Sequence, residues 1–180
     1  TGLQQVRDPA VKFRILKDMT HIRSFPPIED GAANILILGS MPGKESLRAG
    51  QYYAHPRNAF WAIMGDLIGA GPDLPYETRT HILKSAGIAL WDVLASCKRH
   101  SSMDADIDAD SMCANDFVSF FAKHPGITHV FFNGSMADQR AHPAVEGAWR
   151  PTALDVPQDC HPGVFSQVIF QHFAYPGAGD

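Results

Sequence analysis

The chain has 180 residues, of which 45% are hydrophobic and 19% are charged, so it can bury the core of one domain. A formal net charge of −4 argues against a protein that coats DNA, although a local patch of Lys and Arg could still touch a few phosphates. The three cysteines form no CxxC pair, which argues against a disulfide framework and a cysteine-ligated metal. There is no membrane-length apolar run and no signal-peptide pattern, so we expect a cytoplasmic protein with no membrane partner.

Short apolar runs alternate along the chain with segments of helical periodicity. In chain order we predict a strand over 35–38, a long loop over 39–57, helices over 60–68 and 76–85, a strand over 88–94, a helix through 117–121 capped by Asn115, a strand over 130–132, a weaker strand over 153–156 and a weaker helix over 165–173. This alternation predicts an α/β fold: a single three-layer domain over 1–180, with a short, mostly parallel central sheet and helices on both of its faces. Residues 1–24 are expected to form an N-terminal extension or helix.

Basic side chains gather in clusters that could contact phosphates, and the alternative is an ordinary solvated surface. The clusters are Lys12, Arg14 and Lys17; Lys44, Arg48 and Arg57; and Lys98, Arg99 and His100. The acids Asp104, Asp106, Asp108 and Asp110 are expected to gather elsewhere.

The loops at the carboxyl ends of the strands are where parallel α/β folds bind ligands. The loop after Leu38 is rich in functional side chains, because two tyrosines, a histidine, an arginine and an asparagine crowd into residues 52–58. Asn58 could simply cap the helix that follows. A phosphate loop is disfavoured, because the GxxxxGK[ST] spacing is one residue short and Glu45 stands where a metal-binding Ser or Thr is needed.

The same loop carries a longer pattern. From Gly39 to Trp61 the sequence matches G-x-x-P-G-x-x-S-x-x-x-G-x-x-[FY]-A-H-P-x-N-x-F-W, which resembles the first active-site motif of the mismatch-specific uracil/thymine glycosylases. Within the uracil-DNA glycosylase superfamily, the sequence looks closer to the hypoxanthine-DNA (deoxyinosine) glycosylase branch. The residues that carry this resemblance lie in segments 25–28, 39–42, 52–58, 89–94 and 131–134. The resemblance spans roughly residues 22 to 138, and residues 139–180 match poorly.

The resemblance implies a monofunctional DNA glycosylase of base-excision repair. It would hydrolyse the N-glycosidic bond of a deaminated base in DNA, hypoxanthine first and uracil second, as a monomer without metal or organic cofactor. The uracil/thymine enzymes have a water-orienting asparagine where this chain has Met41. A methionine cannot hold that water, so either the site is inactive or, as the resemblance implies, Asn58 takes the role.

The base itself is expected to be bound by the loops after the predicted strands. Backbone amides of the first turn can stabilise the negative charge of the leaving base. Tyr53 occupies the position of the family's stacking aromatic, with a core tyrosine as the alternative. Asn133 either bonds the base edge or makes a turn with Gly134, and Asp92 either faces the pocket or caps a turn. The expected turn residues are Gly39, Ser40, Met41, Pro42 and Gly43.

A second active-site segment is expected near residue 160. The segment from His161 to Ser166 fits H-P-x-x-x-S but not the S-T-S-P-A form of the hypoxanthine branch. His161 could bond the base, and the alternative is a structural histidine in a proline turn. Two other functions stay open: a DNA-lesion-binding protein without catalysis, and a hydrolase of free modified nucleotides.

Overall fold

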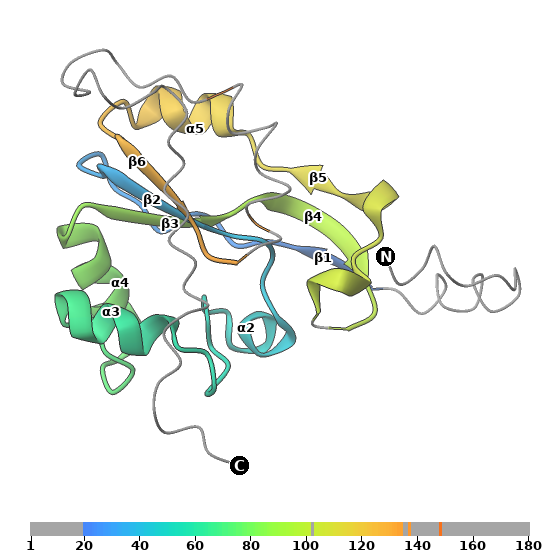
Figure 1. Cartoon of the computed structure of the whole chain (residues 1–180), viewed down its shortest axis with the longest axis horizontal. Helices are drawn as coiled ribbons and strands as arrows, with labels where there is room; N and C mark the ends of the chain where they lie inside the picture. Colours follow the sequence, from blue (N-terminus) through green and yellow to red (C-terminus); the bar gives the residue numbers. More distant parts are fainter. Residues whose placement is uncertain (1–19, 102, 135–136, 138–147, 149–180) are drawn as a thin grey trace, which may run out of the picture.

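A parallel sheet of three strands forms the centre of the computed structural model, which describes residues 20–101, 103–134, 137 and 148 (Figure 1). Strand β2 (Ile35–Gly39) lies between β3 (Ile88–Asp92) and β6 (His129–Phe132). The register places Gly39 opposite Asp92, and Leu38 opposite Phe132. The carboxyl ends of the three strands therefore meet at one edge of the sheet, as the sequence predicted.

Helices cover both faces of this sheet (Figure 1). Helices α3 (Phe60–Ile68) and α4 (Tyr76–Ser85) lie on one face, and α5 (Phe117–Lys123) lies on the other. Successive residues of a strand point to opposite faces. Accordingly, Ile37 packs in the cluster that contains the aromatic side chains of α3, whereas Leu36 packs in the cluster that contains those of α5. The three-layer α/β arrangement is thus the predicted one.

A second sheet is antiparallel and was not predicted. It has the order β1-β4-β5, with β1 (Thr20–Arg23), β4 (Leu94–Arg99) and β5 (Cys113–Ala114). Strands β1 and β5 are short and mostly exposed, so they lack the apolar alternation by which a strand is recognised in a sequence.

The single strand predicted over 88–94 was wrong, because the chain changes sheets at Val93. The backbone N–H groups of Val93 and Leu94 donate to the carbonyl oxygens of Gly39 and Ser40, at 2.8 and 3.2 Å. Beyond this point β4 pairs with β1 instead of β2. One mostly apolar segment therefore contributes strands to two sheets.

The long loop predicted over 39–57 was wrong in part, because it contains the short helix α2 (Lys44–Ala49). The helix ends at Gly50, whose φ of 64° lies in the left-handed region that favours glycine. In the sequence, Gly50 is the residue that could have predicted the end of this helix.

Helix α5 begins one residue later than predicted. The side chain of Asp116 accepts a hydrogen bond from the backbone N–H of Ser119 at 3.0 Å, so Asp116 is the cap and Asn115 is not. Asn115 instead donates from Nδ2 to the carbonyl oxygen of Asp92 at 2.8 Å. This bond ties the start of α5 to the end of β3.

Other predicted elements lie outside the described residues, namely the strand over 153–156 and the helix over 165–173. Of the N-terminal extension or helix expected over 1–24, the structure describes residues 20–24. The first four of these form the strand β1. Between β4 and β5 the chain makes the 3-10 turns η2 (Asp104–Asp106) and η3 (Ala109–Ser111). No helix of the described chain has the length and apolar character needed to span a membrane.

Candidate active site

A cavity of about 510 Å³ opens at the carboxyl ends of β2, β3 and β6. This volume lies in the range of pockets that hold small organic ligands. Every predicted site residue within the described chain lines it, and His161 lies outside the described residues. The lining consists of Gly39, Ser40, Met41, Pro42, Gly43, Lys44, Glu45, Ser46, Tyr52, Tyr53, His55, Asn58, Asp92, Asp104 and Asn133. The structure thus brings the loops after three strands together, while the chemical role of each residue stays a prediction.

Gly39 ends β2 and is required by a close approach of two side chains. A Cβ atom at this position would lie 2.6 Å from Oδ1 of Asp92 and 2.8 Å from the hydroxyl oxygen of Tyr53. Both distances are shorter than a carbon and an oxygen can approach without a shift. The missing side chain therefore allows a carboxyl and a phenol to meet at the floor of the cavity.

The turn after Gly39 directs its carbonyl groups into the surrounding structure. The carbonyl oxygens of Gly39 and Ser40 accept from the backbone N–H groups of Val93 and Leu94. That of Gly43 accepts from Leu47 of α2 at 2.9 Å. Arg99 donates from Nη2 to the carbonyl oxygen of Pro42. Met41 is 7% exposed and packs in the hydrophobic cluster on the α5 side of the sheet, so its side chain contributes packing.

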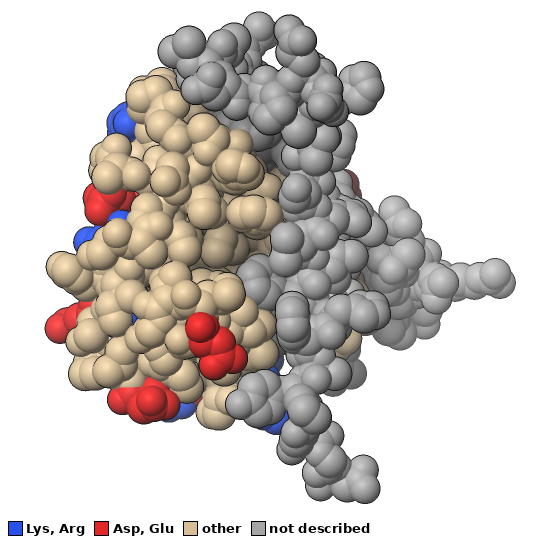
Figure 2. Space-filling view, turned by 60° about the vertical axis from the view of Figure 1, so that its left-hand side comes forward, with Lys and Arg blue, Asp and Glu red and all other residues tan. Residues whose placement is uncertain are grey.

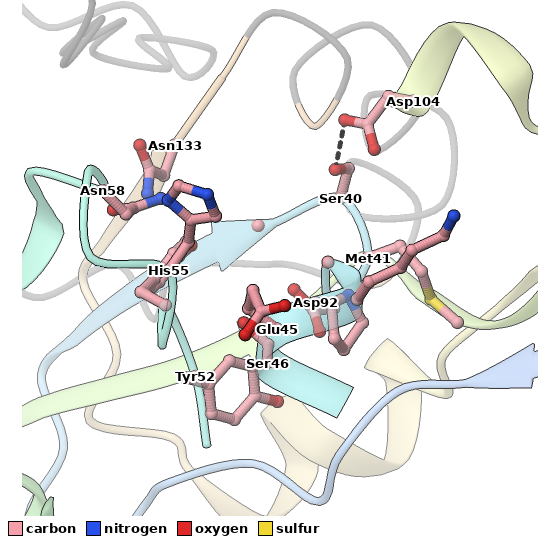
Figure 3. A pocket seen from close by; sticks show the side chains of 15 residues that line it. Ser40, Met41, Glu45, Ser46, Tyr52, His55, Asn58, Asp92, Asp104 and Asn133 are labelled. Carbon is pink, nitrogen blue, oxygen red and sulfur yellow. Dashed lines mark hydrogen bonds between the residues drawn. The ribbon is translucent and has the colours of Figure 1, made fainter. Parts of the chain in front are cut away.

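Asn58 directly precedes Ala59, the N-cap residue of α3, and lines the cavity. Its Oδ1 accepts a hydrogen bond from the backbone N–H of Phe60 at 2.9 Å. Because that N–H can only donate, the bond fixes which end of the amide is the oxygen, and one lone pair of Oδ1 stays available for another donor. Figure 3 shows Asn58 beside His55 and Asn133, with Met41 on the other side of the cavity. Ala59 occupies the N-cap position of α3, so the capping alternative was wrong as stated, although Asn58 still satisfies one free N–H at the start of the helix.

Tyr53 is the one non-glycine residue of the described chain with a positive φ, at 54°. Such a conformation costs about 1–3 kcal/mol and is typical of functional sites. One face of its ring stacks on Phe60, with ring centroids 4.2 Å apart. The hydroxyl is buried, and burial followed by the charge of Asp92 raises its pKa, while the side chain of Asn133 opposes the shift.

Asp92 lies at the floor of the cavity with 3% of its surface exposed, which favours the pocket-facing alternative. Its Oδ2 has no hydrogen-bond partner among the described residues. Burial, followed by repulsion from Asp104, raises the pKa of this carboxyl to about 8, and the Arg99 guanidinium partly opposes the rise. A carboxyl with this pKa is mostly neutral at pH 7 and can donate a hydrogen bond as well as accept one.

Asp104 and Arg99 belong to the site, although the sequence placed both elsewhere. Asp104 was expected in a separate acidic stretch, but it lines the cavity and accepts a hydrogen bond from the Ser40 hydroxyl. Arg99 was expected in an exposed basic cluster, but it is 2% exposed. Asp104 contacts Ser40 across 64 positions of the sequence, and Arg99 contacts Pro42 across 57 positions. Local sequence patterns do not predict contacts over such separations.

The surface in Figure 2 carries separate basic and acidic side chains, with no continuous basic stripe on the described part of this face. Arg48, expected in a basic cluster, is paired with Glu45 of its own helix at 2.7 Å. Among the described residues, no group of three or more His, Cys, Asp or Glu is placed to hold a metal ion.

The residues that line the cavity lie within a segment that matches a known protein family. A family model described as the uracil DNA glycosylase superfamily matches residues 26–160, which include the whole lining of the cavity. The chain belongs to this superfamily. Its membership places it among DNA glycosylases, as the sequence predicted, and accounts for its mixed α/β fold.

Two relatives and one solved structure are similar in sequence to this chain over about two thirds of its length. Two proteins named hypoxanthine DNA glycosylase, from Methanosarcina barkeri and Methanosarcina acetivorans, are 38% and 39% identical over 118 residues, which is 65% of this chain and 73% of each relative. A solution NMR structure of a candidate uracil DNA glycosylase from Methanosarcina acetivorans matches with a TM-score of 0.61 and 37% identity, over 71% of this chain and 78% of that chain.

Proposed function

We propose that the protein is a monofunctional DNA glycosylase of base-excision repair that removes hypoxanthine and, as a second substrate, uracil. The observation that carries the proposal is the convergence of Asn58, Tyr53 and the Gly39–Gly43 turn around one cavity, above the buried carboxyl of Asp92. The two similar proteins named hypoxanthine DNA glycosylase support the choice of base.

The reaction replaces the bond between C1′ of the sugar and the base nitrogen with a bond between C1′ and a water oxygen. The bonding electron pair leaves with the base, and the water gives up a proton that finally neutralises the base. Positive charge therefore develops on the sugar and negative charge on the base. The base must be everted from the duplex to reach a cavity of this kind.

Asn58 is assigned the placement of the attacking water. Its Oδ1 is already oriented by the bond from the Phe60 N–H, and its second lone pair can accept a proton of the water. An amide is a weak base, but an electron-poor sugar needs a well-placed water more than a strong base. Met41 cannot do this because it is packed in the hydrophobic cluster.

The Gly39–Gly43 turn is assigned the stabilisation of the leaving base. Carbonyl oxygens of the turn accept hydrogen bonds from the backbone of Val93, Leu94 and Leu47 and from the side chain of Arg99. The amide N–H groups of the turn are therefore the polar groups suited to a developing anion. Donors that are already in place when the charge develops are each worth about 10²–10³ in rate.

Asp92 and Asn133 are assigned the recognition of the base edge. Hypoxanthine and uracil share a neighbouring ring N–H and C=O, which need one acceptor and one donor. A neutral Asp92 carboxyl or the Asn133 amide offers this pair, and the unpartnered Oδ2 of Asp92 is the kind of buried atom that a ligand would satisfy. Tyr53 is assigned to pack its ring against the base, which is worth about 1–3 kcal/mol per stacked base.

Two substitutions of Asn58 separate its chemical role from its hydrogen bond to the start of α3. Asn58→Ala removes both, so it should lower excision of hypoxanthine from a duplex by about 100-fold or more and lower the free energy of unfolding by about 0.5–2 kcal/mol. Asn58→Ser keeps an oxygen that can accept from the Phe60 N–H but is too short to hold a water in the cavity, so it should lose activity and keep stability. The measurement is abasic-site formation, with thermal unfolding alongside; wild-type excision by Asn58→Ser would contradict the assignment.

The substrate itself is tested with duplexes that carry one hypoxanthine, uracil, xanthine or thymine. We expect abasic product with hypoxanthine first. Tight binding of the lesion without abasic product would instead favour a lesion-binding protein. Activity on dITP but not on inosine-containing DNA would favour a hydrolase of free nucleotides.

A further inference from the structure

We propose that Arg99 is a positioning residue that holds the Gly39–Gly43 turn in the orientation needed to stabilise the leaving base. This inference rests on the proposed glycosylase function. Arg99 ends β4 in the antiparallel sheet and reaches the turn with a side chain that is 2% exposed. It has no direct place in the wall of the cavity, so it must act through the turn.

Arg99 and Asp104 form hydrogen bonds with two different residues of the turn. Nη2 of Arg99 donates to the carbonyl oxygen of Pro42, while Asp104 accepts from the hydroxyl of Ser40. Nη1 of Arg99 lies 4.0 Å from Oδ1 of Asp104, which links the two points into one unit. We call this unit of Arg99, Asp104, Ser40 and Pro42 the clasp.

The Pro42 carbonyl is held differently from the carbonyls of Gly39, Ser40 and Gly43. The carbonyl oxygens of these three residues accept from the backbone N–H groups of Val93, Leu94 and Leu47. The Pro42 carbonyl accepts from a side chain instead. Without Arg99 this carbonyl could rotate, and an oxygen turned toward the cavity would repel the negative charge of the leaving base.

The burial of the guanidinium itself argues for a specific use. Removing a charged group from water is costly unless it is paired and hydrogen-bonded, and an apolar side chain could fill the same space at lower cost. In Arg99, Nη1 is buried without a hydrogen-bond partner among the described residues, although Asp104 is near. The positive charge behind the turn also favours an anion in front of it.

The test uses Arg99→Met, which keeps an unbranched side chain in the core, and Arg99→Lys, which keeps the charge but not the planar fork. Lys123→Met on the exposed end of α5 is the control for loss of a positive charge. Single-turnover excision of hypoxanthine is measured against enzyme concentration, with thermal unfolding of each variant. We expect Arg99→Met to lower the chemical rate by about 10- to 100-fold, which is the loss typical when a residue that orients a metal ligand is removed, with little change in the half-saturating concentration.

A second readout separates positioning from general stability. Uracil and 5-fluorouracil have nearly the same shape, but the fluorine makes the base a better leaving group. If the clasp stabilises the leaving anion, Arg99→Met should slow uracil excision more than 5-fluorouracil excision, and Arg99→Lys should lie between Arg99→Met and the wild type. Should uracil prove a poor substrate, hypoxanthine and xanthine provide the pair, since xanthine is the more acidic base.

The outcomes distinguish the two proposals. An active wild type with an equal rate in Arg99→Met overturns the clasp alone. An equal slowing of both leaving groups, or a loss that follows the loss of folded protein, also overturns it. A wild type that forms no abasic product from any lesion overturns the proposed function and the clasp with it.

Discussion

The two sheets of the described chain contribute to the cavity in different ways. The parallel sheet β3-β2-β6 supplies groups that line the cavity, among them Gly39, Asp92 and Asn133 at or just past its strand ends. The antiparallel sheet β1-β4-β5 supplies Arg99, which contacts the same turn from behind. The comparison teaches that the strand ends of one sheet line the cavity, while a side chain of the other sheet holds the turn between them.

The largest effect is expected where the two regions meet, at Gly39. In Gly39→Ala the new Cβ would fall 2.6 Å from Asp92 Oδ1 and 2.8 Å from the Tyr53 hydroxyl, so both side chains must move. A misplacement of about 1 Å can cost about 100-fold in rate, and we expect a loss of that size in hypoxanthine excision. Gly31→Ala is the control, since its Cβ would meet nothing within 4 Å. Equal activity of Gly39→Ala and wild type would break the comparison.

A smaller, pH-dependent effect is expected at Asp92. Its pKa is about 8, so the neutral donor form is lost as the pH rises through this value, and excision by the wild type should fall above about pH 8. Asp92→Asn keeps a donor and an acceptor without titrating, so its activity should lack this alkaline decline. A pH–rate profile in which wild type and Asp92→Asn decline alike would remove Asp92 from base recognition.

The raised pKa of Asp92 should also make the free energy of unfolding depend on pH. Its pKa is raised from 3.8 in the unfolded chain to about 8, so between these values the folded state binds the proton and the unfolded state does not. The free energy of unfolding should therefore decrease as the pH rises from about 4 to about 8. Asp92→Asn should show a weaker decrease over this range, which chemical denaturation at several pH values would measure.

The smallest effect is expected at Asp116, which does not line the cavity. Asp116→Ala removes the cap of α5, so the unfolding temperature should fall slightly while excision stays unchanged. Hydrogen bonds from Ser119 lower the pKa of Asp116, so its contribution is present above the unfolded pKa and is lost as the pH falls. The difference in unfolding temperature should therefore shrink in acid. A clear loss of excision in Asp116→Ala would mean that α5 also restrains the site.

The sequence alone determined the parallel sheet, the helices over 60–68 and 76–85, and the residues of the first active-site motif. These features depend on neighbours in the chain: buried side chains repeat at the period of a strand or helix, and the motif is one continuous segment. The bound of α4 matched because Tyr76–Ser85 is followed closely by the helix-ending Gly87.

Only the tertiary structure decided how those residues are held. The strand predicted over 88–94 divides at Val93, because its pairing partner changes there from β2 to β1. Arg99 and Asp104 reach Pro42 and Ser40 across 57 and 64 positions, and the neutral state of Asp92 follows from burial and a facing carboxylate. Long-range contacts and the desolvation of a charge depend on the complete packing around a group, and local sequence patterns do not contain that packing.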